Sequence, residues 1–351
     1  MIRPAFAAWL AKSKPFGAGE QSRFSEAARR AGLGLCHIDN RMMIASSHAI
    51  PTSGSWIVGS LFRRGEATPL TEATLRASFG TVSAASELTR GHWGDYVAFG
   101  TSRDGRYAVR APFGSLSRYW QDAPDHVILA SSVRLLGAFG GSAPAVDWHA
   151  VGQFLAATDL RNGRTCLRGV EELAGGQAIE VYDRGIRLER HWSPWSWTDR
   201  AQAFHTRDAA AEALAGAIDT AVVSRLPVDV PAILLLSGGL DSSVVAAALA
   251  SNGRRFTCLT MVVADAQGDE RDHAGPWRAI STSRWSKSFA ILVKSISRVP
   301  SRVACRDQPV RSSAKQHLRL RTTWREKPVR RWSSMAVAAT TCSARCKASP
   351  R

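Results

Sequence analysis

The stretch Ala232–Val245 reads AILLLSGGLDSSVV and decides the fold of the second half of the chain. Its first five residues form an unbroken apolar run, which has the length of a strand buried on both faces. Gly238 and Gly239 then allow backbone angles closed to other residues and leave no side chain between the loop and a ligand. From Asp241 the apolar residues recur at helical spacing until an Asn-Gly pair. The stretch therefore predicts a strand, a glycine loop and a helix.

This geometry places the amides of the loop at a helix N-terminus, beyond the carboxyl end of the strand. Unpaired N–H groups and the positive end of the helix dipole favour a phosphate or pyrophosphate there. The serines add hydroxyl donors, and Asp241 is the candidate ligand for a Mg²⁺ ion that would bridge to the phosphates. The candidate nucleotide site comprises Leu236, Ser237, Gly238, Gly239, Leu240, Asp241, Ser242 and Ser243.

The loop differs from the two best-known phosphate loops. A Walker loop needs a lysine before its Ser or Thr, and a dinucleotide loop needs G-x-G-x-x-G, whereas this loop reads G-G-x-D-S-S. It resembles the SGGxDS pyrophosphatase loop (PP-loop) of the N-type ATP pyrophosphatases, and its LSGGLDSS spelling resembles the asparagine synthetase family. That resemblance implies ATP and Mg²⁺ as cofactors, with the loop holding the diphosphate released when ATP adenylates a carboxylate.

The first half of the chain has a β-rich pattern. Short alternating or apolar runs, separated by turn residues, predict a layered and mostly antiparallel sheet. A helix is expected at Phe24–Leu35, and another, capped by Asp147, at His149–Ala156. The predicted strands are Ser55–Phe62, Trp93–Thr101, Tyr107–Pro112 and Val127–Ala130, and the hairpin Gln177–Asp183 with Ile186–Arg190 turns at Arg184-Gly185.

The same half resembles the asparagine synthetase family through four segments in the family's order. These are WGDYVAF from Trp93, RAPFG from Arg110, ILASSVRLL from Ile128 and TCLRGVEELAGG from Thr165. The resemblance implies an α/β protein with three parts. Residues 1–195 would be a class II amidotransferase-like domain, residues 200–274 the first part of a parallel-sheet PP-loop ATP domain, and residues 275–351 a basic tail without family resemblance.

Glutamine-using members of the family carry a nucleophilic cysteine at position 2, where this chain has Ile2. The first cysteine is Cys36, and a mid-chain thiol has no free α-amine to act as its base, so we expect glutamine hydrolysis to be absent. That departure, with VDWHAVGQFLA and WSPW, points to the lasso-peptide cyclase branch. There a peptide carboxylate is adenylated and the peptide's own amine displaces AMP, which implies a peptide or amino-acid carboxylate substrate and possible pairing with a precursor-peptide leader protein.

A second strand is expected at Phe256–Val263. Ligands of parallel α/β sheets lie beyond the carboxyl ends of the strands, so the end of this strand should flank the adenine and ribose. The nearest candidates are Thr260, Met261 and Val262. The segment Asp269–Ala274, DERDHA, resembles the family's D-E-x-x-(F/Y/H)-A helix start. The family's second acidic motif and its later catalytic lysine are not found, so no catalytic residue is assigned.

Most of the net charge of +17 lies in residues 275–351, which hold 18 Lys and Arg against Asp307 and Glu326. Three interpretations compete: a nucleic-acid-binding extension, a disordered basic arm, and a shift of the reading frame near Gly275, which the Arg-, Ser- and Trp-rich composition favours. Cys342, Cys346 and His317 lack zinc-site spacing. No run reaches the length of a membrane span, and six scattered cysteines fit a cytoplasmic protein.

These observations favour ATP-dependent carboxylate adenylation and amide-bond formation, as in asparagine synthases, with a lasso-peptide macrolactam cyclase as the leading form. One alternative is a glutamine-hydrolysing asparagine synthase homologue, active in asparagine biosynthesis. The other is a catalytically dead module that binds a peptide or a partner. Nucleic acid is the least favoured partner, and the sequence leaves the oligomeric state open.

Overall fold

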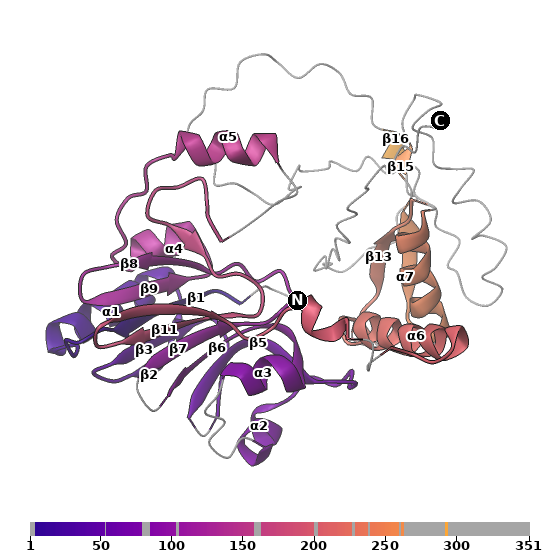
Figure 1. Cartoon of the computed structure of the whole chain (residues 1–351), viewed down its shortest axis with the longest axis horizontal. Helices are drawn as coiled ribbons and strands as arrows, with labels where there is room; N and C mark the ends of the chain where they lie inside the picture. Colours follow the sequence, from indigo (N-terminus) through magenta and orange to yellow (C-terminus); the bar gives the residue numbers. More distant parts are fainter. Residues whose placement is uncertain are drawn as a thin grey trace, which may run out of the picture. The chain divides into compact units, whose positions relative to one another are not determined.

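The computed structural model describes residues 4–52, 54–78, 85–102, 105–157, 163–199, 203–226, 229–237 and 239–259, and the strands at 261–262 and 292–293. The chain divides into two units, Met1–Phe204 and His205–Arg351 (Figure 1). Within the described residues, no helix combines the length and the apolar character that crossing a membrane requires.

The first unit contains two six-stranded sheets, and within each sheet neighbouring strands run antiparallel. The first sheet has the order β10-β8-β9-β1-β3-β2, with bounds β1 Phe6–Ala11, β2 Gly34–Ile38, β3 Met42–Ser46, β8 Tyr119–Asp122, β9 His126–Ala130 and β10 Glu171–Glu172. The second has the order β12-β11-β7-β6-β5-β4, with bounds β4 Ala49–Pro51, β5 Ser55–Arg63, β6 His92–Thr101, β7 Arg106–Arg110, β11 Gln177–Tyr182 and β12 Gly185–Arg190. This confirms the layered, antiparallel domain expected from the alternating runs.

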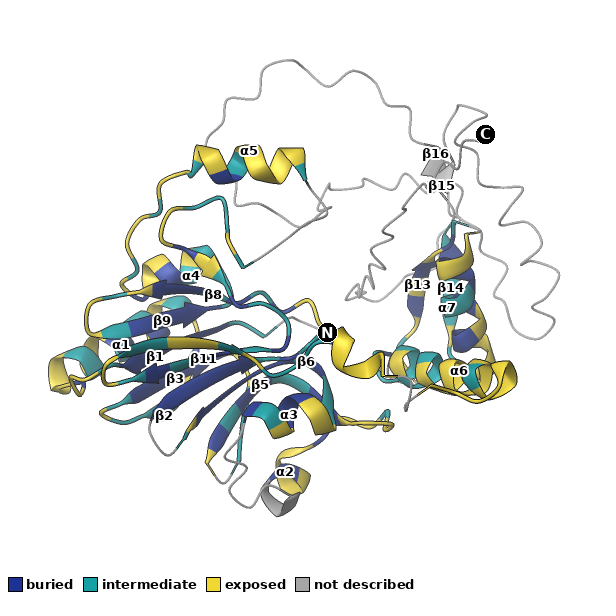
Figure 2. Ribbon diagram, in the orientation of Figure 1, coloured by how far each residue is buried: buried dark blue, intermediate teal, exposed yellow. Residues whose placement is uncertain are grey.

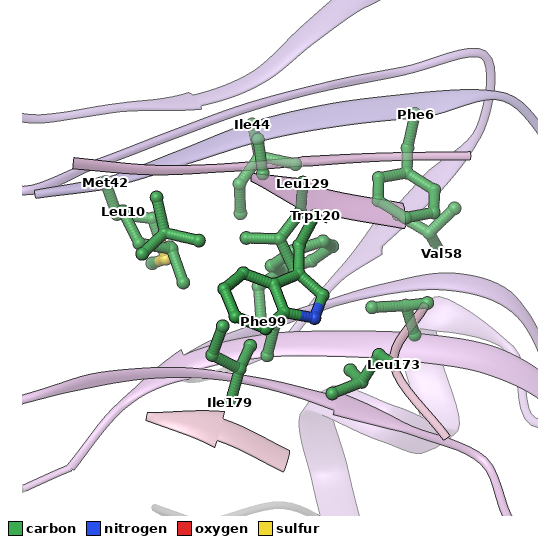
Figure 3. Close-up of a cluster of buried hydrophobic side chains, with 14 of the residues drawn as sticks. Phe6, Leu10, Met42, Ile44, Val58, Phe99, Trp120, Leu129, Leu173 and Ile179 are labelled. Carbon is green, nitrogen blue, oxygen red and sulfur yellow. The ribbon is translucent and has the colours of Figure 1, made fainter. Parts of the chain in front are cut away.

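Apolar side chains from both sheets form the central core of this unit (Figure 3). Phe6 and Leu129 of the first sheet meet Phe99 and Ile179 of the second, and all four are at most 1% exposed. The outer face of the first sheet packs against the helices α1 Ala18–Ala31 and α4 Val133–Ala138, and that of the second against α2 Glu72–Ser78 and α3 Ala85–Gly91. The layers are therefore helix, sheet, sheet and helix.

Strand β1 is the main element that sequence reasoning missed. The segment Phe6–Ala11 is buried along its whole length and pairs with β3 on one side and β9 on the other. Phe6, Ala8 and Leu10 face the central core, while Ala7, Trp9 and Ala11 face the helix layer. A strand covered on both faces reads as an unbroken apolar run without alternation. The segment therefore lacks the alternation of apolar and polar residues by which a half-buried strand is identified.

Two further expectations need correction at their bounds. The helix expected at Phe24–Leu35 is α1, which ends earlier because Gly32 adopts a left-handed φ of 68°. The residues that follow it form β2 instead. The hairpin of β11 and β12 turns at Asp183-Arg184, because Tyr182 pairs with Gly185. The other predicted strands lie within one or two residues of β5, β6, β7 and β9.

Helix α5, Trp148–Ala156, begins where predicted, and the Asp147 carboxylate caps it by accepting a hydrogen bond from the Ala150 amide at 3.1 Å. Its apolar stripe does not enter a core in the described structure. Leu155 is 70% exposed and Phe154 37% exposed. The linker that follows the hairpin contains a short 3₁₀ helix, η1, at Pro194–Trp197.

Fewer helices and strands of the second unit lie within the described residues. They are α6 Arg207–Val223, β13 Ala232–Leu235, α7 Leu240–Ser251, β14 Phe256–Leu259, β15 Met261–Val262 and β16 Leu292–Val293. Thr206 caps α6, accepting a hydrogen bond from the Ala209 amide at 3.2 Å. Of the apolar residues of α6, Leu214 is 62% exposed, whereas Val222 is partly buried and packs against the core of this unit.

A buried ion pair holds the loop after β7 against β6. The Asp95 carboxylate accepts hydrogen bonds from the amides of Ser115 and Leu116 at 2.9 Å and from Arg118 at 3.1 Å. Burial by itself would raise the pKa of Asp95, but the bonds from Leu116 and Ser115 and the Arg118 charge outweigh it and lower the pKa below 3.8. Because the Arg118 side chain is fully buried, loss of the Asp95 carboxylate would leave its charge only partly compensated, by Glu172.

Replacing Phe99 with alanine should destabilise the first unit by about 3–5 kcal/mol, since the substitution leaves a cavity between the two sheets. Urea unfolding measures this as a lower midpoint with an unchanged m-value. Phe204→Ala is the matched control, because Phe204 is 58% exposed and should change stability by less than about 0.5 kcal/mol. Equal effects of the two substitutions would contradict the assignment of Phe99 to the core.

Asp95→Asn should remove part of the acid sensitivity of folding. A carboxyl whose folded pKa is lowered contributes stability that is complete above its unfolded pKa and is lost as the pH falls through the folded value. Urea midpoints between about pH 6 and pH 2.5 should therefore fall less steeply for Asp95→Asn than for the parent chain. A slope that is the same in Asp95→Asn and in the parent chain would contradict this account.

Candidate functional site

The candidate site is the turn from β13 into α7, and its backbone has the expected form. Strand β13 pairs in parallel with β14, with Ala232 opposite Phe256 and Leu235 opposite Leu259. The Leu236 amide continues the ladder by donating to the Leu259 carbonyl at 3.0 Å. Gly239 then caps α7, which runs to Ser251. The predicted strand, loop and helix are thus confirmed, with parallel strands at the site.

The burial of β13 differs from the expectation of a strand covered on both faces. Ala232 and Leu234 are buried, whereas Ile233 is 55% and Leu235 50% exposed (Figure 2). Helix α7 supplies the cover of the buried face through residues such as Ala246 and Leu249. No described residue covers the opposite face in the same way. The apolar run therefore indicated a strand correctly but not its surroundings.

The glycines of the loop also differ from expectation. Gly239 has φ −72° and ψ 166°, an extended conformation open to any residue. A methyl group added there would lie 3.3 Å from the Ser237 hydroxyl oxygen and would meet no backbone atom. Gly238 lies outside the described residues. The backbone angles at position 239 do not require a glycine. A glycine there instead leaves open space beside the loop amides.

The hydroxyl groups of Ser237 and Ser242 tie the loop together. The Ser242 oxygen accepts from the Ser237 amide at 3.3 Å, donates to the Gly239 carbonyl at 3.2 Å, and lies 3.1 Å from the Ser237 oxygen. The Gly239 amide donates to the Ser237 oxygen at 3.3 Å. These contacts are all long for hydrogen bonds between such groups. They connect the residues of the loop but are weaker than short hydrogen bonds. Two predicted phosphate donors thus have internal partners.

Ser243 has a different environment. Its side chain is 6% exposed, and its hydroxyl oxygen has no hydrogen-bond partner among the described residues. Its amide donates to the Gly239 carbonyl and so belongs to the helix. An unpartnered buried hydroxyl costs about 1–3 kcal/mol, and it is usually explained by a missing water or ligand.

The first turn of α7 presents two further predicted residues. Leu240 is 79% exposed, and Asp241 is exposed as well. A helix leaves its first amides without an intrahelical acceptor, and no other described residue accepts from the amides of Leu240 or Asp241. The Asp241 carboxylate is thus available beside free amides, which is the arrangement needed for a cation that accompanies a phosphate.

The remaining predicted residues are only partly placed. Thr260 and the segment Asp269–Ala274 lie outside the described residues, as do Cys342, Cys346 and His317. Met261 and Val262 form β15, which pairs in parallel with Leu292–Val293. The described part of the structure therefore gives only the backbone of β15.

Cys36, the first cysteine of the sequence, can be examined for nucleophilic character, whereas Ile2 lies outside the described residues. Cys36 lies on β2, is partly buried, and contacts the Gly34 carbonyl at 3.5 Å. Burial raises the pKa of its thiol. A nucleophilic cysteine needs a lowered pKa, so Cys36 has the environment of a structural residue.

Sequence reasoning missed one group of possible ligands. Glu180, Glu189 and His191 come together on the hairpin of β11 and β12 and the residue after it. The signal that could have found them is strand alternation combined with the hairpin register, which places Glu180 and Glu189 on one face.

Two serine substitutions should have opposite effects on the ligand-free chain. Ser242→Ala removes three contacts in the loop and should destabilise the second unit by about 1 kcal/mol. Ser243→Ala removes an unpartnered buried hydroxyl and should be neutral or stabilising by up to about 1 kcal/mol. Thermal unfolding compares them, with Ser251→Ala, at the far end of α7, as the control. If Ser243→Ala proved the more destabilising of the two, the described hydroxyl network would be wrong.

Comparison with known proteins adds family information for this part of the chain. The family model "Asparagine synthase" matches residues 213–320, an interval that contains the loop and extends past Ala274, where we expected the resemblance to end. An asparagine synthetase [glutamine-hydrolyzing] of Triphysaria versicolor is 30% identical over 156 residues. These residues are 44% of this chain and 25% of the relative, so the aligned part spans about a quarter of the relative's length.

Solved structures give weaker matches. A glutamine phosphoribosylpyrophosphate amidotransferase from B. subtilis, complexed with ADP and GMP, aligns with 73% of this chain and 65% of its own, at 11% identity and a TM-score of 0.32. A structure of the allosteric regulatory enzyme of purine biosynthesis aligns with 72% of this chain and 58% of its own, at 11% identity and a TM-score of 0.29. Scores this low establish no shared fold. The family match and the curated relative support the asparagine synthase family for this chain.

Proposed function

We propose that this chain is built for ATP-dependent carboxylate adenylation and amide-bond formation. The observation that carries the proposal is the position of the first turn of α7 at the carboxyl end of a parallel strand, with free amides at Leu240 and Asp241. In open α/β sheets this is where phosphate-bearing ligands lie. The match of the asparagine synthase family to residues 213–320 supports ATP as the nucleotide.

The residues of the loop fit a pyrophosphate group. Leu240 and Asp241 offer amides, and Ser243 offers a buried hydroxyl without a partner. Ser237 and Ser242 can exchange their long mutual contacts for bonds to phosphate oxygens, because hydrogen bonds to an anion are shorter and stronger. The helix dipole adds about 0.3–1 kcal/mol of favourable interaction with negative charge.

The proposed reaction has two steps. A carboxylate oxygen of the substrate attacks the α-phosphorus of ATP, and the bond to the bridging α,β-oxygen breaks, so pyrophosphate leaves with its electron pair. An amine then attacks the acyl carbon, loses a proton, and displaces AMP. The loop amides and hydroxyls stabilise the charge that develops on the departing pyrophosphate. Asp241 would hold a Mg²⁺ ion, whose role is to neutralise phosphate charge.

Within this function, we infer a lasso-peptide cyclase type of substrate. The segments VDWHAVGQFLA and WSPW resemble the lasso-peptide cyclase branch, and burial raises the pKa of the Cys36 thiol, so the amine would come from the substrate itself. A peptide would then supply both the carboxylate and the amine, with a precursor-peptide leader protein as a possible partner. The curated relative's name, which specifies glutamine hydrolysis, favours the alternative of an asparagine synthase homologue.

The test is ATP–pyrophosphate exchange in the full chain with a peptide carboxylate as substrate. Exchange should fall about 10²-fold or more in the double variant Ser237→Ala, Asp241→Ala, since each change removes a group that contacts the leaving group. Ser251→Ala should retain the parent rate. Replacing the peptide with aspartate plus glutamine or ammonia, as the supplied substrates, distinguishes the asparagine synthase alternative.

Two outcomes would contradict the proposal. Exchange that survives the double substitution would show that the loop is not the pyrophosphate site. Peptide binding of the same affinity with and without ATP, accompanied by no exchange in the parent chain, would identify a binding module without catalysis.

A further inference from the structure

The hairpin of β11 and β12 brings three metal-binding side chains to one place, far from the glycine loop in sequence. Ala178 pairs with Glu189, and Glu180 pairs with Arg187, so Glu180 and Glu189 project from the same face. The alternate residues Ile179 and Val181 point into the central core. His191 follows Glu189 by two residues and joins the group. Sequence alternation and register thus place two carboxylates and one imidazole together.

The ligand atoms lie slightly farther apart than a single bound ion would hold them. One ligand atom from each of Glu180, Glu189 and His191 lies within 4.8 Å of the others, and His191 Nδ1 is 4.0 Å from Glu189 Oε1. That separation is too long for a hydrogen bond. Two ligands that each lie about 2.0–2.2 Å from a zinc ion are at most about 4.4 Å apart. Small rotations of partly buried side chains would therefore complete the coordination.

The imidazole has unused bonding capacity. His191 Nε2 is buried and has no hydrogen-bond partner among the described residues, while the Nδ1 side of the ring faces Glu189. Either ring nitrogen of a neutral histidine can bind a metal. The His191 side chain is 12% exposed, so the ring is held in place by its surroundings.

Neighbouring groups favour a cation as well. The Tyr182 hydroxyl donates to one oxygen of Glu180, which fixes that carboxylate in the manner of an outer-shell partner. The guanidinium of Arg187 lies 3.1 Å from Glu189 and compensates one of the two negative charges. Its side chain is 62% exposed and can move aside into water. Two carboxylates with a single guanidinium leave an excess negative charge for a metal ion to neutralise.

We propose that Glu180, Glu189 and His191 form a binding site for a divalent transition-metal ion, with Zn²⁺ as the ion that the ligand set suits best. Imidazole favours zinc over magnesium or calcium, and two carboxylates with one imidazole give three protein ligands. The fourth tetrahedral position would be open to water. The ion would fasten the end of β12 to β11, immediately before Trp192, whose ring packs on Phe113 at 4.9 Å.

The test is a zinc titration of the full chain by isothermal calorimetry, after its cysteines have been alkylated so that no thiol contributes. The parent chain should bind one equivalent of Zn²⁺. Glu189→Gln, which keeps the shape of the side chain, and His191→Ala should each weaken binding about tenfold or more, since even outer-shell partners contribute that much. His149→Ala is the matched control, because His149 is exposed and paired with Gln153 on α5.

Visible absorption of the Co²⁺-loaded alkylated chain provides a second readout, with bands expected for four-coordinate nitrogen and oxygen ligands in the parent and lost in Glu189→Gln. Circular dichroism of each variant establishes that it is folded. Zinc affinity that is unchanged in both Glu189→Gln and His191→Ala would overturn the proposal. Loss of affinity in His149→Ala alone, or no binding to the parent chain, would overturn it too.

Discussion

The first unit depends on the burial of apolar surface on both faces of strand β1. Its six residues contact the second sheet on one side and α1 and α4 on the other, so one short segment belongs to two cores. Each fully buried large apolar side chain contributes about 1.5–3 kcal/mol. Because β3 and β9 both pair with β1, the register of the first sheet is set from this strand outward.

The second unit depends on a different kind of interaction, the hydroxyl contacts at the start of α7. Ser237, Ser242 and Gly239 satisfy one another through long hydrogen bonds, whereas Ser243 keeps a buried hydroxyl without a partner. A loop built in this way is stable enough to keep its shape and retains polar groups for a ligand. Sites that hold ligands commonly carry such unsatisfied groups, at a cost in stability.

Sequence patterns predicted elements whose residues carry a local signal. The strand before the glycine loop, the helix after it and the cap at Asp147 all follow from residue chemistry within a few positions. Sequence patterns failed where the burial of an element depends on residues distant in the sequence. The run that forms β1 and the run that forms β13 look alike in sequence, yet β1 is covered on both faces and β13 on one. The proposed metal ligands on β11 and β12 come together only through the pairing of two strands, which no local pattern contains.

The uncovered face of β13 has a thermodynamic consequence. Ile233 and Leu235 are 55% and 50% exposed, and a sheet of two strands, which is what β13 and β14 form within the described residues, is only marginally stable by itself. Free energy gained from a bound nucleotide would then add directly to that of folding, as mass action requires for a ligand that selects the ordered form. If the proposed nucleotide site is correct, nucleotide affinity and the ordering of this unit would be coupled, and the apparent dissociation constant would include the free-energy cost of ordering the loop.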